Sequence, residues 1–120
     1  MRVTSQAPVL VLIGADPRRS HRAGEALRIA LGIASGDNDV VIVLVGPATH
    51  LLDADTDALV DGDDVAKFRA SLRTLGVPLH VEEAARPSER NWNADGHPVV
   101  FGGRADIVAL ARASRRALIF

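Results

Sequence analysis

The sequence predicts an α/β fold, a three-layer sandwich in which a mostly parallel sheet of about five strands has helices on both faces. Two apolar runs, at 8–14 and 40–46, each end in glycine and are typical of strands buried on both faces. Segments with helical spacing of apolar residues alternate with the strands, which favours parallel pairing and right-handed crossovers. A chain of 120 residues is expected to form a single domain over 1–120.

The first part of the chain is expected to contain a strand and a helix. Residues 1–6 are polar and precede the strand at 8–14. Asp16-Pro17 then predicts a helix N-cap with proline at the first helical position. The helix that follows has alanine and leucine at i, i+3, i+4 spacing. It should end at Gly36, a residue able to adopt a left-handed C-terminal cap.

The middle of the chain is expected to hold an acidic loop, a second helix and a third strand. Residues 47–52 follow the second apolar run as a short helical or irregular segment. An acidic surface loop is expected over 53–64. Apolar spacing predicts a helix over 65–75, which Gly76 caps, and a strand at 77–81.

The last part of the chain is expected to complete the sheet. Residues 82–96 are polar and long for a loop in a compact domain, so this segment is either partly helical or functional. A fourth strand at 98–101, a helix over 105–113 and a last strand at 117–120 follow. Ligands of parallel sheets bind beyond the carboxyl ends of the strands, so the loops at those ends are the candidate sites.

Composition limits the classes of function. The net charge is −1 and aromatic residues make up 3%, so neither a basic surface nor stacking platforms point to nucleic acid. The apolar runs are too short to span a bilayer. The sequence has no cysteine, which excludes disulfides, thiolate metal sites and thiol nucleophiles. This composition is expected of a cytoplasmic protein.

Three local patterns accompany this order of elements. Asp16-Pro17 precedes the alanine- and leucine-rich segment 22–32, a glycine-led strand entry lies at 75–83, and a short apolar strand ends the chain at 118–120. Together they resemble the DsrE/DsrF-like family, which includes the Tus sulfur-relay subunits. The resemblance covers nearly the whole chain and implies the same α/β sandwich.

The resemblance also sets an expectation about function. Relay members of the family hold a reactive cysteine just after the third strand, where this chain has Glu82, Glu83 and Ala84. Partner-type subunits of the family can lack that thiol. The resemblance therefore implies a divergent or non-catalytic member of the sulfur-relay family. Such a subunit would form a homo-oligomer, or a hetero-oligomer with a thiol-bearing relative. No residue is assigned a catalytic role, which favours a protein that is not an enzyme.

The alternative is a small-molecule or anion-binding protein that uses the loop after the first strand. Asp16, Arg18, Arg19 and His21 lie at the predicted helix start, where backbone N–H groups and arginine favour phosphate or carboxylate. The same residues also fit a capped helix with solvated arginines or ion pairs between subunits. No nucleotide-binding glycine motif is present in the sequence.

Two further segments end predicted strands and are candidate ligand-binding residues. Glu82 or Glu83 could act as a base if buried, but adjacent strand residues face opposite sides, and pairing with arginine explains them equally well. Gly102, Gly103 and Arg104 could bring backbone N–H groups to an anion, or could form a tight turn.

Neither a metal nor another cofactor is expected. The aspartates of 53–64 are spaced like those of a calcium loop, but Ala58 stands where that loop needs glycine. The histidines lack close ligand spacing along the chain; they are His21, His50, His80 and His97. Trp92 is either an interface anchor or a local cover of the core.

Overall fold

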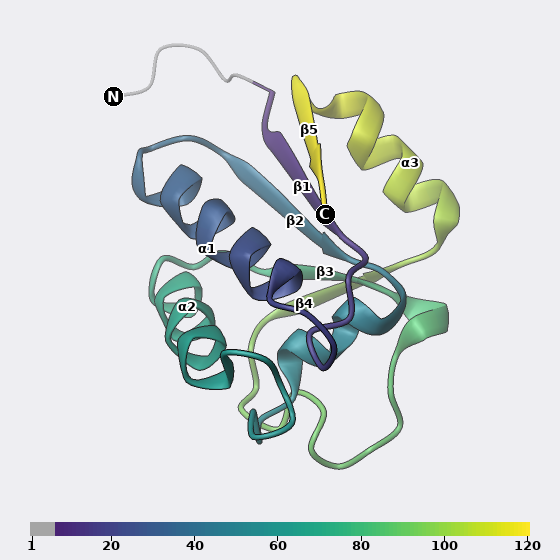
Figure 1. The fold of residues 1–120 in the computed structure, drawn as a ribbon. Coiled ribbons are helices and arrows are strands. Elements are labelled where there is room, and N and C mark those ends of the chain that lie inside the picture. The colour runs from purple at the N-terminus through teal and green to yellow at the C-terminus, as the bar shows by residue number, and fades with distance from the viewer. Residues whose placement is uncertain (1–6) are drawn as a thin grey trace.

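A computed structural model describes residues 7–120 and shows a five-stranded parallel sheet with helices on both faces (Figure 1). The polar residues 1–6, expected before the first strand, lie outside the described residues. Along the sheet the strands have the order β4-β3-β2-β1-β5, and every neighbouring pair is parallel. The strands are β1 (Val9–Ile13), β2 (Val40–Leu44), β3 (Leu79–Glu82), β4 (Val99–Gly102) and β5 (Arg116–Ile119). The predicted fold class is therefore confirmed.

The main core lies between the sheet and two of the helices, α1 (Arg22–Ser35) and α2 (Gly62–Thr74). Val11, Ile42 and Leu79 are partners in adjacent strands and are fully buried on this side. The helix α3 (Arg104–Ala113) lies on the opposite side of the sheet (Figure 1). Among the described residues, none of the helices is long and apolar enough to cross a membrane.

Helix α1 begins later and ends differently than predicted. Asp16 does not cap it, because its carboxylate accepts the Arg18 N–H at 2.9 Å and its carbonyl accepts the Arg19 N–H, which closes a local turn. The helix begins only at Arg22. At the other end Gly36 has φ −89°, and the left-handed residue is Asp37 with φ 63°.

Helix α2 begins three residues earlier than predicted, at Gly62, and so shortens the acidic loop. Two aspartates in its first turn favour this start through the helix dipole. Gly76 adopts φ 75°, the left-handed conformation typical of a helix-ending glycine. Because the Val77 N–H donates to the Leu72 carbonyl at this helix end, β3 begins at Leu79.

The segment between β3 and β4 contains one short turn of 3-10 helix, η2 (Glu83–Ala85), and is otherwise irregular. Within this irregular segment, the side chain of Trp92 packs on the core. Its side chain is buried, its indole N–H donates to the Thr49 carbonyl at 2.8 Å, and its ring lies 6.0 Å from that of Phe101. Trp92 therefore covers the core, as one of its two interpretations predicted.

Candidate functional site

The candidate site lies at the carboxyl edge of the sheet, where the loops after β1, β2 and β3 meet. The 3-10 helix η1 (Gly46–Leu52) follows β2 and forms the centre of this edge. Glu82 at the end of β3 accepts the Gly46 N–H at 3.0 Å. The Thr49 hydroxyl lies 3.3 Å from the Ala85 carbonyl. These contacts hold η1 against the β3 loop.

The chain after η1 pairs with the segment that precedes β4. Asp53 and Trp92 form an antiparallel bridge. The Asn93 N–H donates to the Leu52 carbonyl at 2.8 Å, and the Ala54 N–H donates to the Asn91 carbonyl at 2.9 Å. This pairing brings the second segment beside η1, and Glu89 comes with it.

A buried arginine of α2 fixes the backbone of the site. Arg69 of α2 is 2% exposed, and its guanidinium donates to the carbonyls of Leu51 and Asp53 at 2.7 and 2.8 Å. It also donates to the Asp95 carboxylate at 2.9 Å. Burial lowers the pKa of Arg69 and Asp95 opposes this, but a guanidinium stays charged in proteins. Arg69 thus positions the residues that end η1.

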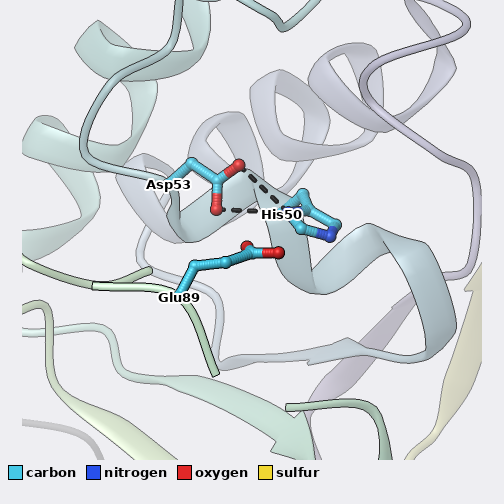
Figure 2. Close-up of side chains that lie close together, drawn as sticks. All are labelled: His50, Asp53 and Glu89. Carbon is cyan, nitrogen blue, oxygen red and sulfur yellow. Dashed lines mark hydrogen bonds and ion pairs between the residues drawn. The ribbon is translucent and has the colours of Figure 1, made fainter. Parts of the chain in front are cut away.

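The centre of the site is a cluster of His50, Asp53 and Glu89, shown in Figure 2. His50 Nδ1 lies 3.2 and 3.0 Å from the two carboxylate oxygens of Asp53. One candidate ligand atom from each of the three residues lies within 4.8 Å of the others. Asp53 is buried, His50 is partly buried and Glu89 is exposed.

The electrostatics of the cluster centre on Asp53. Burial raises the pKa of its carboxyl, the hydrogen bond and charge of His50 oppose that rise, and the negative charge of Glu89 adds to it. At the border of the cluster, Arg18 donates to Asp16 at 3.0 and 3.1 Å. This hydrogen bond holds the pKa of Asp16 below its ordinary value.

The overall sign of the cluster is negative. Arg18 exerts a favourable charge interaction on Asp53 and Glu89 but is already paired with Asp16. Three carboxylates therefore face a single guanidinium when the His50 imidazole is neutral. Such a group can attract a cation or hold a proton between imidazole and carboxylate. Anion binding in this loop stays a prediction.

Of the residues predicted from the sequence, the structure brings Asp16 and Arg18 to this cluster. Arg19 and His21 are exposed, and the His21 side chain does not cap α1. The remaining predicted residues lie elsewhere.

Glu82 and Glu83 end β3 with different surroundings. Glu82 is partly buried and its carboxylate binds the Gly46 N–H, whereas Glu83 is exposed in η2. The Gly103 N–H donates to the Asp106 carboxylate at 2.8 Å, and this contact lies at the start of α3. Gly102 ends the edge strand β4, Gly103 connects it to α3, and Arg104 begins that helix.

The sequence interpretation missed His50, Asp53 and Glu89 as a group. Only one signal was readable: His50 and Asp53 are three residues apart, a spacing that places side chains together on a helical turn. Nothing in the sequence of the polar segment 82–96 distinguishes Glu89 from its neighbours. Glu89 lies near His50 because Asp53 pairs with Trp92, and this contact joins segments that are distant in the chain.

The protein is a small three-layer α/β protein. Its candidate site is a polar cluster beyond the carboxyl ends of the parallel strands. Among solved structures the chain is similar to the crystal structure of the ychN protein from E. coli, with a TM-score of 0.71 and 16% identity. The match covers 97% of this chain and 100% of that chain. At this identity the likeness shows the fold, which is of the DsrE/DsrF-like type. No family model and no curated protein matches the sequence.

Proposed function

We propose that the protein is a divergent, non-catalytic DsrE/DsrF-like subunit that acts by assembling with further copies of itself. The likeness of fold and the absence of cysteine both support this proposal. At the end of β3, where relay members of the family would hold a thiol, Glu82 stabilises the Gly46 backbone. The position thus has a structural contact in place of a sulfur carrier.

The observation that supports assembly best is the poorly covered face of the sheet toward α3. Leu12, Val43 and His80 lie on this face, in a row that Ile119 and Val100 continue to the two edges. At those edges Ile119 is 68% exposed and Val100 is 46% exposed. Neighbouring exposed apolar side chains of this kind are a feature of interaction sites.

Helix α3 itself is only loosely packed on this face. None of the described residues of α3 is buried, and Val108 is 41% exposed. A cavity of about 410 Å³ lies between α3 and strands β3 and β4, lined mainly by apolar side chains that include Val100, Ile107 and Leu110. Contact with another chain would bury the exposed edge residues Ile119 and Val100 and hold α3 in place.

A second copy fits this face because the chain has complementary charged regions. The end of the chain around α3 has exposed arginines, at Arg104, Arg112, Arg115 and Arg116. The acidic region has exposed aspartates, at Asp55, Asp57, Asp61, Asp63 and Asp64. Opposite charges on separate regions of one chain steer copies toward each other, while burial of the exposed apolar side chains supplies the contact energy.

Sedimentation velocity of the untagged protein tests the proposal. The wild type is expected to sediment as an oligomer, and Val108→Asp on α3 should shift it toward the monomer, because burial of a carboxylate in the contact is unfavourable. Leu75→Asp is the matched control, since Leu75 is 50% exposed at the end of α2. A wild type that stays monomeric at high concentration would refute self-assembly. An equal effect of both variants would show that the α3 side of the sheet is not the contact surface.

A further inference from the structure

We propose that His50, Asp53 and Glu89 form a binding site for a divalent transition-metal cation, with Zn²⁺ as its simplest probe. The residues supply one imidazole nitrogen and two carboxylate oxygens, which lie within 4.8 Å of one another. Figure 2 shows the three side chains converging from η1, its end and the loop before β4. This inference is independent of assembly, because all three residues belong to one chain.

The distances fit a metal after a small movement of one side chain. Zinc bonds to nitrogen and oxygen are about 2.0–2.2 Å long, so two ligands of one tetrahedral ion lie roughly 3.4 Å apart. His50 Nδ1 and the nearer Asp53 oxygen are already 3.0 Å apart. Glu89 is exposed, so its side chain can rotate toward the other two without disturbing the core.

The backbones of two candidate ligands, His50 and Asp53, are already fixed before a metal binds. Asp53 is 7% exposed, and its backbone is fixed by Arg69 and by the bridge to Trp92. His50 lies on η1, whose end Arg69 also holds through the Leu51 carbonyl. Two preorganised ligands and one adjustable ligand reduce the conformational entropy lost on binding.

The charges also favour a cation. Asp53 and Glu89 repel each other across a partly desolvated space, and a divalent ion between them removes that repulsion. Arg18 and Asp16 also act on the cluster, and they are paired with each other. Arg18 therefore offsets only part of the negative charge of the two candidate ligands.

The donor set selects the type of ion. An imidazole with carboxylates suits Zn²⁺, Co²⁺ or Ni²⁺, while Ca²⁺ and Mg²⁺ prefer sites made of oxygen alone. Three protein ligands leave a coordination position open for water or another molecule. The expectation of no metal rested on histidine spacing along the chain, and spacing cannot register a ligand from a distant segment.

Calorimetric titration of the untagged full chain with Zn²⁺ tests the site, and the visible absorption of bound Co²⁺ reports its coordination. Glu89→Gln and His50→Gln should each weaken Zn²⁺ binding at least about tenfold, since loss of a ligand exceeds the loss of an outer contact. Glu89 is exposed, so its variant should fold normally. The control is the double variant His21→Gln, Glu83→Gln, which removes an exposed imidazole and carboxylate elsewhere and should bind as the wild type does.

Two results would overturn the site. One is a wild-type protein that shows no Zn²⁺ binding. The other is an affinity that stays the same in Glu89→Gln and His50→Gln, which would place the bound ion elsewhere on the chain. A rise in the unfolding temperature with Zn²⁺, present in the wild type and control and absent in both variants, would support the site.

Discussion

Replacement of Arg69 by methionine should destabilise the protein strongly, because this buried guanidinium holds two backbone carbonyls as well as a carboxylate. Its hydrogen bonds to the Leu51 and Asp53 carbonyls, at 2.7 and 2.8 Å, lie in the interior. Each buried acceptor left without a donor costs about 1–3 kcal/mol. Methionine refills part of the volume, so we expect a loss of roughly 3–4 kcal/mol in the free energy of unfolding. This is a large share of the stability of a typical domain, which is about 5–15 kcal/mol.

Asp95→Asn separates the two kinds of contact that Arg69 makes. The Asp95 side chain is 43% exposed, so its ion pair with Arg69 should contribute only about 0.5–1 kcal/mol. Urea unfolding followed by fluorescence measures both variants, because Trp92 is the single tryptophan and lies buried beside η1. A loss below about 1 kcal/mol in Arg69→Met would refute the role of the carbonyl contacts. Equal losses in the two variants would assign the effect to the ion pair instead.

Gly62→Ala should lower the free energy of unfolding by about 2 kcal/mol, because its new Cβ would lie 2.1 Å from the Thr56 carbonyl oxygen and the backbone must shift. Gly32→Ala is its control, since among the described residues no atom outside the local helix backbone lies within 4 Å of the Cβ that this change adds. Alanine in the helix should raise the free energy of unfolding by roughly 0.5–1 kcal/mol. Comparable losses in the two variants would contradict the steric argument. Acid should destabilise the wild type through His97, whose pKa is lowered by burial and whose Nδ1 has no hydrogen-bond partner among the described residues. Because the folded pKa lies below the ordinary 6.5, this stability is present above that pH and falls as the pH drops toward the folded pKa. Urea midpoints at two pH values measure the loss, and His97→Gln should reduce it; an unchanged pH dependence in that variant would rule His97 out.

The approximate positions of the strands could be predicted from the sequence because their apolar runs are local and continuous. The segments 8–14 and 40–46 contain β1 and β2, and Gly76 adopts the left-handed conformation typical of the end of a helix. Boundaries were less certain where a side chain competes with the helix for backbone groups. Asp16 is the clearest example, since its carboxylate closes a turn and delays α1 to Arg22.

The candidate site could be predicted only in part. The rule that ligands bind beyond the carboxyl ends of parallel strands indicated the correct edge, and Asp16 and Arg18 do lie there. The same reasoning treated Gly102 and Arg104 as equivalent to them. In the structure Gly102 ends the edge strand β4, which β3 separates from β2, and Arg104 begins α3.

The sequence by itself determined the fold class and the absence of thiol chemistry, because both follow from local pattern and composition. Only the tertiary structure decided which polar residues meet. Glu89 reaches His50 and Asp53 because an irregular segment pairs with the end of η1, and Arg69 fixes that end from a separate helix. Contacts between distant segments depend on packing and backbone pairing, and these leave no periodic signal in the chain.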